Sequence, residues 1–140
     1  MVDEITKAQT AVEEEVTIFD RIVRKEIPAK IIYEDENSLA FRDINPVTPT
    51  HFLVIPKNRN GLTGLRKATD EHAQLLGQLL IVCAKVAKQE GLEDGYRTVI
   101  NDGKHAGKEL SFLRKFIGQT VFHLHIHVIG GKQLSWPPGV

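Results

Sequence analysis

The spacing of the hydrophobic residues changes several times along the chain, and it first predicts two helices. Thr17 can cap a short helix that Pro28 ends, and a longer helix is predicted from about Thr69 to Glu90, with Gly91 in the stop position. One face of the short helix carries Ile18, Phe19, Ile22 and Val23. The apolar stripe of the long helix consists of Leu75, Leu76, Leu79, Val82, Cys83 and Val86.

Short runs of high strand propensity, separated by turn residues, predict five strands. Glu36 and Asn37 separate the first two runs, which suits an antiparallel pair. The expected strands are Ile31–Glu34, Ser38–Asp43, His51–Ile55, Arg97–Asn101 and Val121–Ile129. Because helices and strands do not alternate as they do in βαβ units, we expect an α+β domain with an antiparallel sheet.

The composition indicates one domain and excludes several classes of protein. With 140 residues, 41% of them hydrophobic, the chain suits a single domain over 17–140, preceded by a flexible acidic segment at 1–16. Eighteen basic residues balance 18 acidic ones, which argues against nucleic acid or a membrane surface as a partner. Cys83 is the only cysteine, which excludes a secreted domain held together by disulfides within the chain. The first sixteen residues contain no apolar run long enough for a signal peptide. We therefore expect a cytoplasmic protein that can also be nuclear.

Three of the six histidines alternate with large apolar residues in one predicted strand. The period of two places His123, His125 and His127 on one face, while Phe122, Leu124, Ile126 and Val128 point into the core. Isolated histidines such as His72 and His105 are expected in ordinary structural positions. Imidazoles that charge together repel one another, so three on one face indicate a metal, an anion or proton transfer.

A metal is the weaker of these explanations. At about 3.3 Å per residue, the outer two imidazoles lie roughly 13 Å apart, too far to share one ion, so a further ligand such as His51 would be needed. A phosphate suits the row better, because a neutral imidazole is a good nucleophile toward phosphorus. Gly118, Gln119 and Thr120, just before the predicted strand, could hold the phosphoryl oxygens through amides and a hydroxyl. We expect no metal and no cofactor.

The chain resembles the histidine triad (HIT) family of nucleotide-binding proteins. The signature is Val121-Phe-His-Leu-His-Ile-His-Val-Ile129, and the resemblance extends through Thr17-Ile-Phe-Asp-Arg-Ile, Phe41-Arg-Asp-Ile-Asn-Pro and Asn101-Asp-Gly. The ending Trp136-Pro-Pro-Gly is similar to that of the histidine triad nucleotide-binding (Hint) branch. This branch implies a homodimeric adenosine phosphoramidase, which hydrolyses an adenosine monophosphate joined to an amine such as lysine. His127 stands where the family's nucleotidyltransferases usually carry glutamine, so transfer activity is less expected.

The resemblance implies a role for each matching residue. His125 matches the nucleophile that becomes nucleotidylated, and His127 matches the residue that contacts the phosphate and assists the leaving group, with His123 and His51 in support. We expect the amine to take its proton through His127 or Thr120. The remaining residues are expected around the nucleotide: Asp43 and Ile44 at the ribose, Asn101, Gly118 and Gln119 at the phosphate, and Phe19, Ile18 and Ile22 at the adenine.

The chain departs from the family in one loop, and two other functions are compatible with the sequence. Between Asn101 and Gly118 the chain carries an inserted loop at about 104–117, which could be a disordered tip, a lid or a partner surface. A nucleotide-binding regulatory module with protein partners would bind a purine mononucleotide without turnover. A dinucleoside polyphosphate hydrolase would act on a different substrate with the same histidines.

Overall fold

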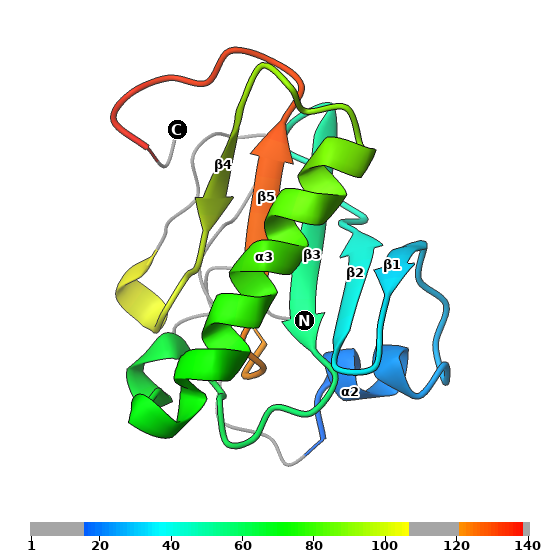
Figure 1. Ribbon diagram of the computed structural model, residues 1–140, viewed down its shortest axis with the longest axis vertical. Helices are drawn as coiled ribbons and strands as arrows, with labels where there is room; N and C mark the ends of the chain where they lie inside the picture. The colour runs from blue at the N-terminus through cyan, green and yellow to red at the C-terminus, as the bar shows by residue number, and fades with distance from the viewer. Residues whose placement is uncertain (1–15, 107–120, 139–140) are drawn as a thin grey trace, which may run out of the picture.

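One antiparallel sheet organises the molecule, as the sequence predicts. The structure is a computed structural model and describes residues 16–106 and 121–138. The strands are β1 (Ile31–Glu34), β2 (Ser38–Arg42), β3 (Thr50–Pro56), β4 (Tyr96–Val99) and β5 (Ile126–Gly130). Their order across the sheet is β1-β2-β3-β5-β4, and every neighbouring pair is antiparallel (Figure 1). The histidine-bearing strand β5 is therefore internal, between β3 and β4.

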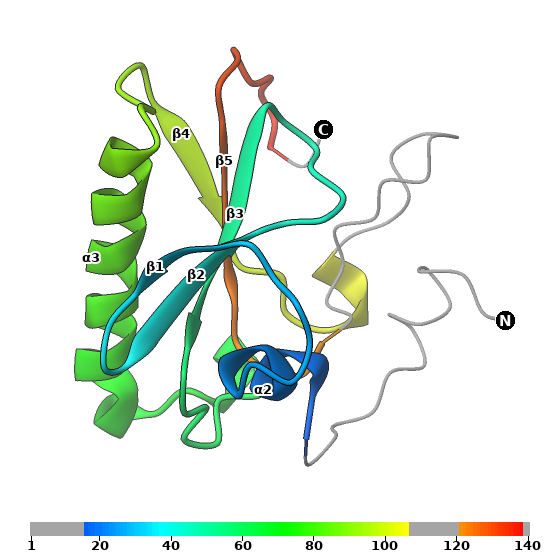
Figure 2. The same ribbon diagram turned by 90° about the vertical axis from the view of Figure 1, so that its right-hand side faces the viewer.

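The two helices cover opposite faces of this sheet. Helix α3 (Ala73–Gln89) crosses one face diagonally, and α2 (Ile18–Val23) lies on the other face (Figures 1 and 2). Short 3-10 turns at Leu65–Lys67 and Asp70–His72 precede α3, and a third follows β4 at Lys104–Ala106. No helix in the described parts of the chain is long and apolar enough to cross a membrane.

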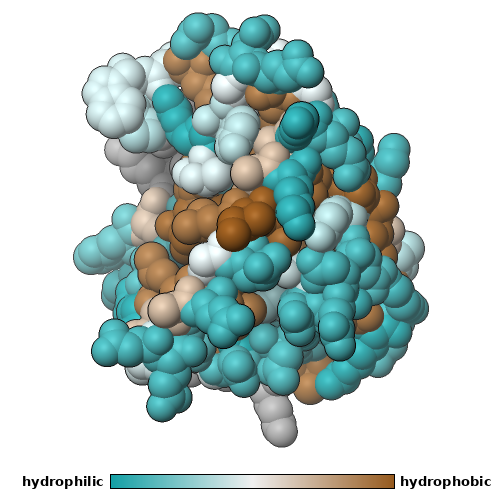
Figure 3. All heavy atoms as spheres, viewed as in Figure 1, coloured by the Kyte–Doolittle hydropathy of each residue, from teal (hydrophilic) through white to brown (hydrophobic). Residues whose placement is uncertain are grey.

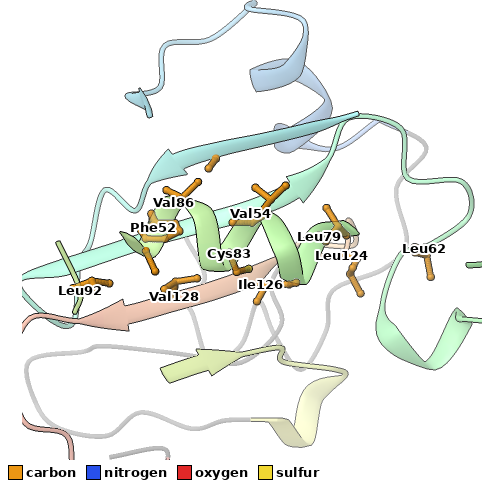
Figure 4. Packing of buried hydrophobic residues seen from close by; sticks show 13 residues of the cluster. Phe52, Val54, Leu62, Leu79, Cys83, Val86, Leu92, Leu124, Ile126 and Val128 are labelled. Atoms are coloured by element: carbon orange, nitrogen blue, oxygen red, sulfur yellow. The ribbon is translucent and has the colours of Figure 1, made fainter. Parts of the chain in front are cut away.

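The apolar stripe of α3 forms the larger core. Leu79, Cys83 and Val86 point toward the central strands, where they meet side chains from β3 and β5 (Figure 4). Fully burying an aliphatic side chain of this size contributes about 1.5–3 kcal/mol. The strand side of this core includes Phe52, Val54, Ile126 and Val128, together with Leu124 just before β5.

A second core lies under α2 and explains why β3 is buried over nearly its whole length. Phe19 and Ile22 of α2 pack with Leu39, Phe41, Leu53 and Ile55, which point away from α3. Thr17 caps the helix by accepting hydrogen bonds from the amides of Phe19 and Asp20 at 3.2 and 3.3 Å. Six residues do not form a stable helix alone, so this cap and the core contacts hold α2 in place.

Both helices depart at one end from the predicted bounds. Helix α2 ends at Val23 rather than at Pro28, because Lys25 adopts a left-handed φ of 61° and the Glu26 amide bonds back to Arg21. Helix α3 starts at Ala73 rather than near Thr69, since the preceding turn is 3-10. At its other end, Gly91 has a φ of 77°, as expected of a stop residue.

The predicted strand Val121–Ile129 is wrong in its first half, because β5 begins only at Ile126. Continuing the β3–β5 register would pair Leu124 with Pro56, which has no N–H to donate. The loop after β3 holds the preceding segment instead: the Arg59 guanidinium donates to the Phe122 carbonyl at 2.7 Å, and the Leu124 amide donates to the Leu62 carbonyl at 2.9 Å. Phe122 is only half-buried rather than a core residue.

Candidate active site

Four histidines and one phenylalanine meet where β3, β5 and α2 approach one another. His51 on β3 and His127 on β5 have ring centroids 5.2 Å apart, and the His125 ring lies 5.1 Å from that of His127. Phe19 of α2 presents an edge to His125 at 5.0 Å and to His123 at 5.9 Å. The structure thus brings together the four histidines that the sequence assigns to the site, although only His127 of the three triad residues lies on a regular strand.

The hydrogen bonds of His125 define which ring nitrogen can react. Its Nδ1 lies 2.8 Å from the carbonyl oxygen of His123, an atom that can only accept, so Nδ1 carries the proton. The lone pair of the neutral ring is therefore on Nε2. Burial is the main cause that lowers the pKa of His125, while the Asp43 charge opposes it. His125 is a neutral imidazole at pH 7 with an available Nε2 lone pair, which is what a nucleophile needs.

His51 and His127 form a second bonded pair with defined tautomers. The Val47 amide donates to His51 Nδ1 at 3.2 Å, so the proton of neutral His51 is on Nε2. His51 Nε2 lies 2.9 Å from His127 Nδ1 and donates to it, which leaves the proton of His127 on its own Nε2. Burial, followed by the neighbouring histidines, lowers the pKa of His127 to about 2. His127 is thus a neutral hydrogen-bond donor toward the space beside His125.

His123 is the most buried residue of the triad, with no exposed surface. Its Nε2 donates to the Pro56 carbonyl at 2.8 Å, and burial lowers its pKa to about 4. Its backbone carbonyl receives the Nδ1 proton of His125. His123 therefore holds the His125 ring in place through its backbone carbonyl.

The residues expected around the nucleotide divide into polar and apolar groups. Asp43 Oδ2 lies 3.4 Å from His51 Nε2, while Asp43 Oδ1 accepts the Asn45 amide at 2.8 Å. Asn101 is buried, and its side-chain nitrogen has no hydrogen-bond partner among the described residues. Asn101 follows the end of β4, whose Val99 pairs with His127, so this donor comes two residues after the strand position that faces the triad.

The apolar group is partly exposed in this chain. Ile44 is 90% exposed and Ile18 is 52% exposed, whereas Phe19 and Ile22 are buried in the core under α2. Exposed aliphatic side chains next to a polar site suit contact with a flat apolar ligand. The expected phosphate contacts Gly118, Gln119 and Thr120 lie outside the described residues, as does the inserted loop except for Lys104–Ala106.

Three ligand-type side chains approach closely enough to be tested as a metal site. One atom each of Asp43, His51 and His127 lies within 4.8 Å of the others. However, a zinc ion would need both His51 Nε2 and His127 Nδ1 as lone-pair donors, and these two atoms share a proton at 2.9 Å. Freeing His51 Nε2 would move its proton to Nδ1, against the Val47 amide. The residues fit a metal only after this pair separates.

Sequence reasoning missed two polar residues behind the histidines, Asp20 and Arg59. Asp20 Oδ1 lies 3.4 Å from His123 Nδ1, and Arg59 Nη2 lies 3.5 Å from Asp20 Oδ2. The spacing of Thr17 and Asp20 is that of a capping box, which could have identified the carboxylate as a helix cap. No sequence pattern connects either residue with the triad.

The fold and the site define a class of small α+β proteins whose centre is a row of neutral histidines at one end of an antiparallel sheet. The chain belongs to the HIT domain family: the sequence model of the HIT domain matches residues 24–113. The match ends before the triad, but individual relatives align over most of the chain.

Those relatives carry different names. The chain is 57% identical over 123 residues to the 14 kDa zinc-binding protein of Zea mays, with 88% of each chain covered. It is 52% identical over 123 residues to adenylylsulfatase HINT1 of Arabidopsis thaliana, covering 88% of this chain and 76% of that protein. Among solved structures, a HIT family hydrolase from Legionella pneumophila has a TM-score of 0.76 at 42% identity and covers 89% of this chain and 100% of its own.

Proposed function

We propose that the protein is a purine nucleoside phosphoramidase that hydrolyses adenosine monophosphate joined to an amine. The observation that carries the proposal is the hydrogen bond from His125 Nδ1 to the His123 carbonyl, which leaves the lone pair of His125 on Nε2. His123 and His127, whose pKa values burial lowers, add no positive charge at pH 7 that would weaken it. The family relationship supports a nucleotide-type substrate.

The proposed reaction has two displacement steps. His125 Nε2 attacks the α-phosphorus, the P–N bond breaks, and the amine nitrogen keeps the electron pair and takes a proton. Water then attacks the phosphorus and gives up one proton to the solvent, the bond from phosphorus to Nε2 breaks, and His125 leaves with its electron pair as adenosine monophosphate is released. His127 Nε2–H and the Asn101 amide are the donors that stabilise the phosphoryl charge.

The tautomer of His127 bears on its expected second role in protonating the leaving amine. Because His51 Nε2–H donates to His127 Nδ1, a second proton on His127 would have to sit on Nδ1, where it would point at the N–H of His51. We therefore propose that the amine takes its proton from water, with His127 acting as a hydrogen-bond donor. Thr120, the other expected proton source, lies outside the described residues.

The test is amine release from an adenosine 5′-phosphoramidate that carries a fluorogenic amine, in the presence of a chelator. Wild type should release the amine, and His125→Ala should lose at least a thousandfold in kcat/KM, the scale of removing a nucleophile. His72→Ala is the matched control, since this histidine binds Thr69 and Asn60 outside the site. If the protein binds adenosine monophosphate but releases no amine from the phosphoramidate, the enzyme proposal is wrong and a nucleotide-binding module is favoured.

The leaving group is the open part of this proposal. The Arabidopsis relative is named an adenylylsulfatase, and sulfate, unlike an amine, needs no proton to leave. Parallel assays with the phosphoramidate, adenosine 5′-phosphosulfate and a dinucleoside polyphosphate rank the three classes by kcat/KM. The phosphoramidase assignment requires kcat/KM to be highest for the phosphoramidate.

Zinc binding is a second candidate, favoured by the approach of Asp43, His51 and His127. The Zea mays relative is named a zinc-binding protein. Calorimetric titration with zinc distinguishes the readings: a resident site gives one ion per chain, lost in His51→Gln, and protons are released on binding. The hydrogen bond between His51 and His127 leads us to expect weak binding that competes with activity.

We also propose a homodimer. Strand β4 is at the sheet edge, and Leu80 and Ile81 of α3 are 51% and 53% exposed. The face over which α3 runs shows a hydrophobic area among polar side chains (Figure 3). Paired β4 edges with α3 packed on a second α3 would cover both features. Sedimentation equilibrium should give twice the chain mass for wild type and a single chain mass for Ile81→Glu.

A further inference from the structure

Behind the triad lies a chain of charged groups that the proposed reaction does not use. It runs from Arg59, in the loop after β3, through Asp20 of α2 to the ring of His123. The Arg59 and Asp20 side chains are each 16% exposed, and His123 has no exposed surface. The protonation state of the His123 ring depends on the balance of these neighbouring charges.

Geometry leaves His123 Nδ1 in an unusual position. Since Nε2 donates to the Pro56 carbonyl, a neutral His123 has its lone pair on Nδ1. That nitrogen has no hydrogen-bond partner among the described residues, and its nearest ionic neighbour is Asp20 Oδ1 at 3.4 Å. A lone pair facing a carboxylate is unfavourable, and a proton placed between them would remove the conflict.

Such a proton would make His123 an imidazolium next to the nucleophile. When His125 Nε2 bonds to phosphorus, positive charge develops on the His125 ring. A charged His123, whose carbonyl already holds the Nδ1 proton of His125, would oppose this charge. The site therefore works best when His123 stays neutral in spite of the nearby carboxylate.

Arg59 is placed to keep it neutral. Its Nη2 lies 3.5 Å from Asp20 Oδ2, while its Nη1 donates to the Phe122 carbonyl at 2.7 Å, one residue before His123. Asp20 Oδ2 also accepts a hydrogen bond from the Thr17 amide at 2.9 Å, which fixes the position of the carboxylate. We propose that Arg59 and Asp20 are positioning residues of the active site: Arg59 offsets the charge of the Asp20 carboxylate and so adds to the burial that keeps His123 uncharged beside His125.

The groups that face His123 in the described structure come from four segments. Helix α2 supplies Asp20, the last residue of β3 supplies the Pro56 carbonyl, the loop after β3 supplies Arg59, and the segment before β5 supplies His125. Burial is the largest cause that lowers the pKa of His123; the hydrogen bond to the Pro56 carbonyl and the Asp20 charge raise it, and the Arg59 charge lowers it. Removing the arginine alone should therefore move the balance toward the protonated ring.

The effect on the reaction rests on the proposed function, so the first readout is independent of turnover. The His123 ring is titrated by NMR in wild type and in Arg59→Gln, with the signal assigned by its loss in His123→Gln. We expect the midpoint of His123 to rise by about one pH unit or more in Arg59→Gln, the scale of one neighbouring charge. In Arg59→Lys the positive charge remains, and the midpoint should stay near that of wild type.

A double variant distinguishes an effect of the Asp20 charge from a purely structural effect of losing Arg59. In Arg59→Gln with Asp20→Asn no carboxylate draws a proton onto His123, so the midpoint should return to or below the wild-type value. The acid limb of the kcat/KM profile should follow the same order, upward in Arg59→Gln and restored in the double variant. Arg42→Gln, which removes an arginine from a separate ion pair with Glu90, is the matched control and should leave both readouts unchanged.

Two outcomes would overturn the proposal. The midpoint of His123 and the acid limb could stay unchanged in Arg59→Gln while the melting temperature falls, which would show a purely structural clamp. Alternatively, the double variant could shift as far as Arg59→Gln, which would show that the carboxylate is not the source of the effect. If wild type releases no amine at all, the proposed function fails, and the NMR titration still decides the role of Arg59.

Discussion

The neutral histidines should make the protein lose stability steeply as the pH falls below about 6.5. Burial holds the folded-state pKa of His123 at about 4 and that of His127 at about 2, whereas an unfolded histidine titrates near 6.5. Between these values the unfolded chain binds a proton that the folded chain does not bind. Acid therefore favours unfolding, and the effect of each histidine is absent above its unfolded pKa.

The size of the effect follows from the number of protons taken up on unfolding. One proton corresponds to about 1.4 kcal/mol per pH unit. Between pH 6 and pH 5 the unfolded histidine is mostly protonated and the folded one is not, so His123 and His127 should each contribute about 1 kcal/mol. The pair should thus lower the free energy of unfolding by roughly 2 kcal/mol over this one unit, and His125, with its lowered pKa, acts in the same direction.

Urea denaturation followed by circular dichroism at pH 7, 6 and 5 measures this slope. Protein concentration is fixed, because a dimer would make stability depend on it. His123→Gln and His127→Gln should each reduce the loss between pH 6 and 5 by about 1 kcal/mol, whatever they do to stability at pH 7. Cys83→Ala, a core change without a proton that titrates in this range, should lower stability equally at all three values. Equal slopes in wild type and both histidine variants would refute the reasoning.

Three further predictions concern the fold. Gly103→Ala should lower the free energy of unfolding by at least about 1 kcal/mol in thermal denaturation, because the glycine has a φ of 77°, in the left-handed region that is unfavourable for alanine. Leu124→Ala should cost about 2–5 kcal/mol in urea denaturation, since the side chain is 1% exposed in the larger core. The thiol of Cys83, whose pKa burial raises to about 12, should react with iodoacetamide at pH 8 only after unfolding.

Local patterns in the sequence were sufficient for most of the fold. Alternation and turn residues identified five strands, and the helical stripe identified the face of α3 that packs on the sheet. The ends of elements were harder, since they depend on partners distant in sequence. The start of β5 is the clearest case: its alternating residues predict a strand from Val121, but the partner strand β3 ends at Pro56.

The candidate site was predictable where it depends on residue identity and not where it depends on contacts. The period of two placed the three histidines opposite the core residues Leu124, Ile126 and Val128, and the resemblance added His51. The tautomers could not be read from the sequence, because they are determined by the Val47 amide and the Pro56 carbonyl. These backbone groups leave no signal in the amino-acid pattern.

The same contacts connect stability with the proposed chemistry. A nucleophilic imidazole must be neutral; burial keeps His125 neutral, and the bond from its Nδ1–H to the His123 carbonyl places the lone pair on Nε2. Burial of neutral histidines is also what makes acid unfold the protein. A nucleotide that binds only the folded state would raise stability at pH 5 without charging or discharging His125. Adding adenosine monophosphate should therefore lower the pH at which the protein unfolds. If activity still falls at a pH where the protein stays folded, the cause is protonation of the histidines.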